Sequence, residues 1–127
     1  MSTDGELVAP LLGDGADSGF AIVPMLTRLI CHADHMIVHL LRPVDVGHSR
    51  WETRWFVADT AVEGVDYDLE KLTGVWRTTN RQDIALCESA ARGVRSRRFV
   101  PGPLHAEFES AVAATLELYL ELMAEAG

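Results

Sequence analysis

The sequence predicts an α+β fold in which an antiparallel sheet is followed by two long helices. Three observations support this prediction. Side chains alternate with a period of two over residues 35–44 and again over residues 49–58, as in strands with one covered face. Only a short turn separates these two segments, which favours antiparallel neighbours. From residue 66 onward, apolar residues recur at helical spacing instead.

Three strands are expected. Residues 20–30 are apolar and β-branched, and Pro24 makes the start of this strand irregular. Residues 32–34 and 43–47 are expected turns. The strand between them places Met36, Val38 and Leu40 on one face and His35, Ile37, His39 and Leu41 on the other. The third strand places Trp51, Thr53 and Trp55 opposite Arg50, Glu52, Arg54 and Phe56.

Two helices are expected after the sheet. The first begins near Asp66 and Asp68, whose carboxylates suit a helix N-terminus, and ends at Gly93 or runs on to Arg98. Pro103 opens the second helix. The stripe of the first helix consists of Leu72, Val75, Trp76, Thr79, Leu86, Cys87, Ala90 and Ala91. The stripe of the second consists of Leu104, Phe108, Ala111, Val112, Thr115, Tyr119 and Leu122.

The composition is that of an ordinary globular domain. The chain has 127 residues, 48% of them hydrophobic, which is enough to bury a core. Its net charge of −8 repels phosphate backbones, so no nucleic-acid partner is expected. No apolar run approaches the roughly 20 residues of a membrane helix, so no membrane association is expected. Residues 1–6 lack the features of a secretory signal, and the expected location is cytoplasmic, with Cys31 and Cys87 reduced.

Residues 1–19 are expected to form a flexible loop segment, because residues 13–19 read GDGADSG. Gly13, Gly15 and Gly19 approximate a dinucleotide-binding fingerprint. The spacing differs by one residue and no strand precedes the glycines, so a phosphate site is not favoured.

Asp83 interrupts the pattern of the first helix. Helical counting places it on the inward face together with Trp76, Asn80 and Cys87. A carboxylate that faces a core needs a partner or a proton. It can reach water at the helix edge, coordinate a cation, or pair with an arginine of the sheet such as Arg28, Arg42 or Arg54. Spacing alone favours water or an ion pair over a metal.

A second candidate metal set consists of His32, His35 and His39, since imidazole suits iron, zinc and copper. His35 and His39 share one strand face. Their spacing matches no ligand motif, and histidines on a half-buried strand usually pack or form hydrogen bonds. The structural interpretation is therefore favoured for these histidines.

One segment resembles a known family. Residues 78–104, TTNRQDIALCESAARGVRSRRFVPGPL, are similar to the signature near the C-terminus of Rieske-type ring-hydroxylating oxygenase α subunits, in the branch that acts on glycine betaine and carnitine. Residues 29–44 and 47–59 resemble the central strands of that family, and residues 7–15 the loop before them. The resemblance implies a partial helix-grip fold of the START/SRPBCC type, an antiparallel sheet packed on a long helix plus a C-terminal helix. Residues 20–127 would then be the C-terminal portion of the catalytic domain.

The resemblance also implies a metal site. In that family two histidines and one aspartate hold a mononuclear Fe(II), and Asp83 occupies the aspartate position within NRQDIALCE. The expected substrate pocket contains Trp76, Thr79, Asn80 and Cys87. Trp76 offers an aromatic face to a trimethylammonium group, or serves only as core. Thr79 and Asn80 are candidates for orienting Asp83.

Two parts of the family pattern are missing. No His-x₄-His segment occurs, and neither does the Rieske domain that carries the [2Fe–2S] cluster in the full-length family. We therefore expect a portion of an O₂-dependent hydroxylase or N-demethylase that is inactive alone and shares its iron with histidines from a missing half or a neighbouring chain. A reductase is the expected electron donor, and a homo-oligomer is a further option. The alternatives are a non-catalytic helix-grip module that binds a small ligand, or a dimerisation module.

Overall fold

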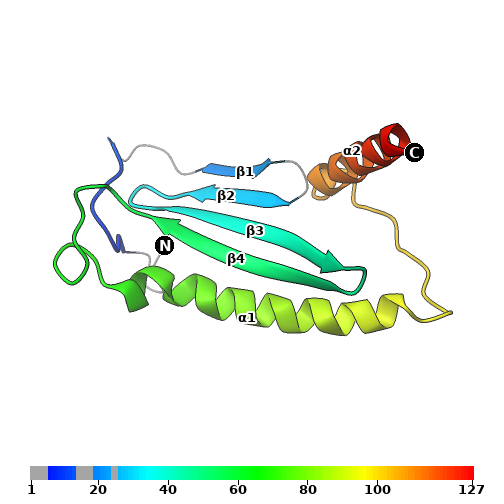
Figure 1. The fold of residues 1–127 in the computed structure, drawn as a ribbon, viewed down its shortest axis with the longest axis horizontal. Coiled ribbons are helices and arrows are strands. Elements are labelled where there is room, and N and C mark those ends of the chain that lie inside the picture. The colour runs from blue at the N-terminus through cyan, green and yellow to red at the C-terminus, as the bar shows by residue number, and fades with distance from the viewer. Residues whose placement is uncertain (1–5, 14–18, 24–25) are drawn as a thin grey trace. The chain divides into compact units, whose positions relative to one another are not determined.

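A computed structural model describes residues 6–13, 19–23 and 26–127. It confirms the α+β prediction, because a four-stranded antiparallel sheet precedes two helices (Figure 1). The strands pair in chain order as β1 (Gly19–Val23), β2 (Thr27–Cys31), β3 (Met36–Asp45) and β4 (His48–Phe56). The helices are α1 (Leu69–Val94) and α2 (Ser110–Ala126). The chain divides into two compact units, Met1–Ser89 and Ala90–Gly127.

The first predicted strand is wrong in one respect, because it is two strands. β1 and β2 occupy the two ends of the segment predicted as residues 20–30 and extend one residue beyond it on each side. They pair antiparallel, with Gly19 opposite Cys31. Pro24, which was expected to make the strand start irregular, lies outside the described residues. Apolar residues continue through the reversal, so hydrophobic periodicity alone did not reveal it.

The turn between β3 and β4 is shorter than predicted. β3 continues past an irregularity after Pro43 as far as Asp45, and β4 starts at His48. Asp45 Oδ1 accepts hydrogen bonds from Gly47 N at 2.7 Å and from His48 Nδ1 at 2.8 Å. A single carboxylate therefore closes this hairpin.

The register of β2, β3 and β4 confirms the predicted alternation. His39 lies opposite Arg28 in β2 and opposite Thr53 in β4, and Ile37 lies opposite Trp55. Paired residues share a face of the sheet. On the face that these residues form, Ile37 is 0% exposed and His39 is 1% exposed.

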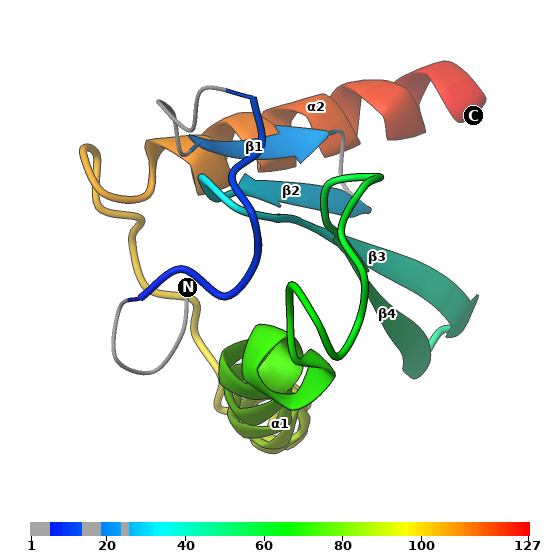
Figure 2. The same ribbon diagram turned by 90° about the vertical axis from the view of Figure 1, so that its left-hand side faces the viewer.

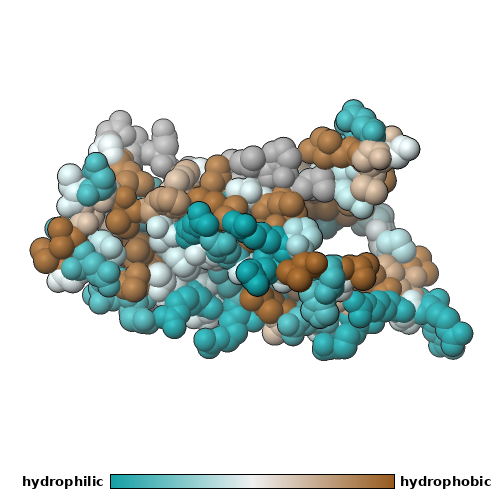
Figure 3. Space-filling model, viewed as in Figure 1, coloured by the Kyte–Doolittle hydropathy of each residue, from teal (hydrophilic) through white to brown (hydrophobic). Residues whose placement is uncertain are grey.

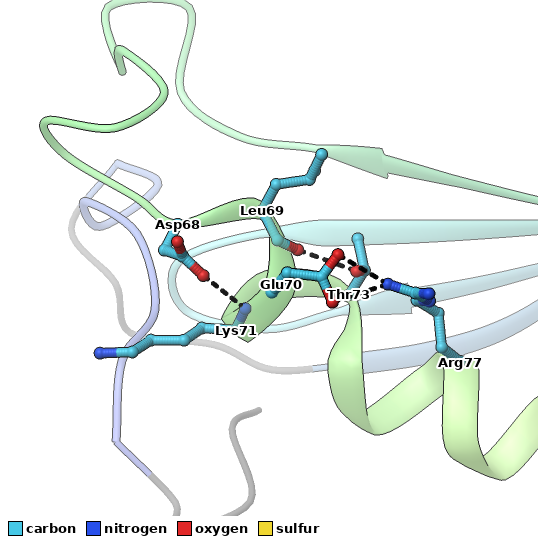
Figure 4. A network of polar contacts seen from close by, with 6 residues as sticks. All are labelled: Asp68, Leu69, Glu70, Lys71, Thr73 and Arg77. Carbon is cyan, nitrogen blue, oxygen red and sulfur yellow. Dashed lines mark hydrogen bonds and ion pairs between the residues drawn. The ribbon is translucent and has the colours of Figure 1, made fainter.

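The N-terminal capping of α1 follows the prediction in part. Asp68 Oδ1 accepts a hydrogen bond from Lys71 N at 2.9 Å, so Asp68 caps the helix that begins at Leu69 (Figure 4). Asp66 does not cap the helix. Its Oδ2 accepts a hydrogen bond from Val62 N at 2.9 Å, in the turn before the helix.

The first turns of α1 carry further polar contacts, which Figure 4 shows. Arg77 Nη1 forms an ion pair with Glu70 at 2.8 Å, two turns apart on the solvent side. Thr73 Oγ1 donates to Leu69 O at 2.8 Å, which satisfies the hydroxyl of a buried threonine. The helix ends at Val94, next to the predicted Gly93.

α1 runs antiparallel to β4 along one side of the sheet (Figures 1 and 2). Hydrophilic side chains line its edge in the face that Figure 3 shows. Leu72 is 2% exposed, whereas all of residues 81–89 are exposed. The predicted inward stripe is therefore correct at Leu72 and wrong at Leu86 and Cys87, which no described residue covers.

The second unit contains α2, which begins at Ser110 and not at Pro103. Turns occupy residues 106–109. His105 Nδ1 accepts hydrogen bonds from two backbone N–H groups of these turns, at 3.3 and 3.2 Å. No residue of α2 is buried, so its predicted apolar stripe stays exposed. Neither α1 nor α2 has an apolar stretch long enough to cross a bilayer.

Candidate functional site

The Thr53 hydroxyl is the centre of a polar cluster between β3, β4 and α1. Its Oγ1 lies 3.0 Å from His39 Nδ1, 3.0 Å from Trp51 Nε1 and 3.1 Å from Asn80 Nδ2. Asn80 belongs to α1, whereas the other residues belong to the sheet. Thr53 therefore joins the helix to the sheet by a side-chain hydrogen bond.

The hydrogen-bonding capacity of this hydroxyl fixes the tautomer of His39. A threonine oxygen accepts two hydrogen bonds and donates one. The indole N–H of Trp51 and the amide N–H of Asn80 occupy both acceptor positions. The hydroxyl proton is therefore donated to His39 Nδ1, and His39 carries its own proton on Nε2.

Two tryptophan rings enclose His39. The ring centroids of Trp51 and Trp76 each lie 5.0 Å from that of His39, and Trp76 approaches edge-on at 61°. These distances suit aromatic pairs. Trp76, a predicted pocket residue, therefore packs on the sheet from one turn before Asn80.

Several buried N–H groups of this region have no hydrogen-bond partner among the described residues. They are His39 Nε2, Trp55 Nε1 and Trp76 Nε1. Trp55 is the cross-strand partner of Ile37, which lies two residues before His39 on β3. Trp55 therefore lies on the same sheet face as His39. Buried polar groups are nearly always hydrogen-bonded, so this concentration of unpaired donors requires an explanation.

Burial lowers the pKa of His39 below its ordinary value, and the positive charge of Arg28 lowers it further. Arg28 is the cross-strand neighbour of His39 on β2. The imidazole is therefore held neutral, which agrees with a single proton on Nε2.

A second polar cluster lies at the start of β3. Asp34, 2% exposed, accepts hydrogen bonds from Val8 N at 2.6 Å, Ala9 N at 3.3 Å and His35 Nδ1 at 2.7 Å. Burial alone would raise the pKa of Asp34, but the hydrogen bonds from Val8 and His35 outweigh it and lower that pKa. The charged carboxylate therefore fastens the N-terminal segment to the sheet.

Asp83 is exposed, so the expectation of a carboxylate facing a covered core is wrong. It still lies on the helical stripe of Trp76 and Asn80, seven and three residues away, and both of these residues contact the sheet. The stripe therefore points toward the sheet side, but the described chain does not extend over it at Asp83.

The ion-pair alternative for Asp83 finds no support in the described residues. Arg42 and Arg54 both pair with Glu52, at 3.5 and 2.6 Å. No salt bridge between described residues includes Asp83. The carboxylate is therefore left with solvent, which is one of the alternatives that the sequence left open, or with a group outside the described residues.

The other predicted site residues are placed as follows. Asn80 donates to Thr53, and its orienting of Asp83 stays a prediction. Thr79 is half-buried and Cys87 is exposed. His35 and His39 form hydrogen bonds, as the structural interpretation predicted. Within residues 6–13, 19–23 and 26–127, no group of three metal-ligating side chains gathers.

Sequence analysis missed the roles of Thr53 and Asp34. A signal for Thr53 was available, because a hydroxyl between two inward tryptophans on one strand needs a polar partner from the covering helix. Asp34 gave no such signal, since an aspartate in a turn is ordinarily exposed. Its partners come from residues 25 and 26 positions earlier in the chain.

Comparison with known proteins identifies the family. Residues 12–125 match the family model described as the ring hydroxylating alpha subunit (catalytic domain). Glycine betaine monooxygenase oxygenase subunits from two Pseudomonas aeruginosa strains are 41% identical over 93 residues, 73% of this chain and 22% of theirs. The counterpart from Chromohalobacter salexigens is 36% identical over 90 residues, 71% of this chain and 20% of its own length. The match thus spans about a fifth of these relatives. The chain belongs to the catalytic-domain family of ring-hydroxylating oxygenase alpha subunits, and its sheet with α1 is the corresponding part of a helix-grip fold.

Proposed function

We propose that this chain forms the C-terminal part of an oxygenase catalytic domain, in which Asp83 is one ligand of a mononuclear Fe(II). The supporting observation is the position of Asp83 on the stripe of α1 that contacts the sheet through Trp76 and Asn80. Its carboxylate is exposed and in no ion pair with a described residue, so its oxygens are available to a cation.

The residues present fit part of an iron site. A facial triad needs two imidazoles beside the carboxylate. The described residues supply no such pair near Asp83, because His35 and His39 are held by Asp34 and Thr53. The two histidines must then come from the rest of the subunit or a neighbouring chain, and the isolated chain is inactive.

When bound, Fe(II) supplies the centre at which O₂ is activated for hydroxylation or N-demethylation. The residues of this chain then have three roles. Asp83 binds the metal, Asn80 holds the preceding turn of α1 to Thr53, and the ring of Trp76 forms a wall of the substrate site. An indole face attracts a quaternary ammonium group, so the proposed substrate is glycine betaine or a similar trimethylammonium compound.

The partners are also part of the proposal. A reductase and a Rieske [2Fe–2S] domain deliver electrons in this family. The described residues contain no group of side chains that could hold such a cluster, so both partners are proposed to lie outside them. The exposed apolar residues Ile84, Leu86 and Cys87 of α1 suit a cover supplied by the rest of the subunit. A homo-oligomer is the alternative cover, and concentration-dependent melting of the isolated chain would favour it.

The test is iron retention. The chain is combined with the segment that carries the two histidines, loaded with Fe(II), passed over a desalting column and assayed for iron. Asp83→Ala should weaken retention more than about 100-fold, because loss of an outer-shell partner alone typically costs 10–100-fold. Glu88→Ala is the matched control, since it removes an exposed carboxylate from another side of the same helix. Equal retention by Asp83→Ala and the parent would refute the proposal.

A further inference from the structure

We propose that the Nε2–H group of His39 is the hydrogen-bond donor that recognises the carboxylate of the substrate, with Thr53 as the positioning residue that fixes its tautomer. This inference rests on the proposed function and adds to it the residue that reads the anionic end of the substrate. In the proposed function the ammonium group of the substrate contacts the indole face of Trp76. The carboxylate at the other end needs a partner of its own.

His39 must donate from Nε2. Thr53 Oγ1 receives both Trp51 Nε1–H and Asn80 Nδ2–H, so its own proton goes to His39 Nδ1. The remaining proton of the neutral ring is on Nε2. This atom is buried and has no partner in the described part of the chain.

The donors around His39 require an acceptor. Trp76 Nε1 is also buried without a described partner, on a ring whose centroid lies 5.0 Å from that of His39. Trp55 Nε1 is a third such donor on the same sheet face. Indole and a neutral imidazole with this tautomer donate but offer no free acceptor, so they cannot satisfy one another. A carboxylate, which only accepts, complements them.

The positively charged Arg28 is the cross-strand neighbour of His39 on β2. The same charge favours an anion at Nε2. Trp51, whose ring packs against His39, is 38% exposed, so this cluster reaches the surface of the described chain at that residue. The exposed Asp83 lies on the Trp76 stripe and provides the opposite charge for a zwitterion.

The experiment uses the complete iron-loaded oxygenase that contains this chain and compares two probes. Glycine betaine carries both a quaternary ammonium group and a carboxylate, whereas tetramethylammonium lacks the carboxylate. His39→Phe should weaken glycine betaine binding about tenfold or more, the effect of losing one hydrogen bond to a charged group. Tetramethylammonium binding and iron content should stay unchanged. His39→Gln, which can place an amide N–H near the Nε2 position, should restore part of the affinity.

Tautomer and control measurements complete the test. Nitrogen NMR should find the His39 proton on Nε2 in the parent, and a mixture of tautomers in Thr53→Val with weaker glycine betaine binding. His48→Phe, at an exposed histidine of the β3–β4 hairpin, should change neither probe. If His39→Phe fails to fold, His39→Gln and Thr53→Val carry the comparison.

Two outcomes separate this inference from the proposed function. Parent-like glycine betaine binding by a folded His39→Phe, with iron retained, would overturn the inference and indicate that ordered water satisfies Nε2. Unchanged iron retention by Asp83→Ala would instead overturn the proposed iron ligand. A parallel loss of both probes in His39→Phe would also overturn the inference, because it would show a general packing defect.

Discussion

Residues 69–80 and 81–89 of α1, both in the first unit, differ in how far they are covered. The same helical stripe, which contains Trp76, Asn80 and Asp83, runs through both halves. In residues 69–80 the stripe reaches the sheet, with Leu72 buried, Trp76 against His39 and Asn80 bonded to Thr53. In residues 81–89 every side chain is exposed, including the apolar Ile84 and Leu86. Helical periodicity states which residues share a face, but the packing of other segments against that face decides how many of them become buried.

This difference has a functional consequence. The docked half holds the rigid elements of the proposed substrate site, whereas the exposed half holds the proposed metal ligand. Asp83 lies one turn beyond Asn80, in the exposed half of the helix. A metal site completed by residues from outside the described chain fits the exposed half, since those residues need access to it.

Matched leucine substitutions test this comparison with the largest expected effect. Leu72→Ala should lower the free energy of unfolding by about 2–5 kcal/mol, because it leaves a cavity at a site that is 2% exposed. Leu86→Ala, at 69% exposed, should change it by less than about 0.5 kcal/mol. Urea unfolding of the isolated chain measures both. An equal loss in the two variants would mean that residues 81–89 are covered in solution.

Acid should lower the free energy of unfolding through buried groups of the sheet, with a smaller effect than the leucine substitution. Burial lowers the pKa of His35 and His39 from the ordinary value of 6.5. Below pH 6.5 the unfolded chain binds protons that the folded chain does not bind. The free energy of unfolding therefore decreases as the pH is lowered, until the pH drops below the folded pKa values of both histidines. At still lower pH, protonation of Asp34, whose folded pKa is also lowered, removes further stability.

The measurement is the urea midpoint at pH 8.0 and at pH 5.5, which should be lower at pH 5.5. His39→Gln should reduce the difference between the two midpoints, because it removes one of the two histidines whose pKa burial lowers. A midpoint that is equal or higher at pH 5.5 would contradict neutral, buried histidines.

Cysteine labelling gives the finest test, with no expected change in stability. Cys87 is exposed on the second half of α1, whereas Cys31 is half-buried in β2. A thiol reagent should therefore modify Cys87 faster than Cys31 in the isolated chain. Addition of the segment that carries the iron-binding histidines should slow the reaction of Cys87 and leave that of Cys31 unchanged, as mass spectrometry of the labelled peptides can show. Undiminished labelling of Cys87 in the complex would place the cover elsewhere.

Patterns in the sequence were enough to predict the fold class, the faces of β3 and β4, the Asp68 cap and the family. These features depend on local periodicity, on one capping side chain or on a run of residues with a specific order. They can therefore be recognised without knowing what lies nearby in space.

Which polar groups meet became visible only in the folded chain. Thr53 binds Asn80 across 27 positions, and Asp34 binds the backbone of Val8 across 26. The fold also leaves Asp83 exposed, together with the rest of residues 81–89. Hydrogen bonding and burial depend on distances between segments remote in sequence, and a period of 3.6 or 2 residues carries no information about those distances.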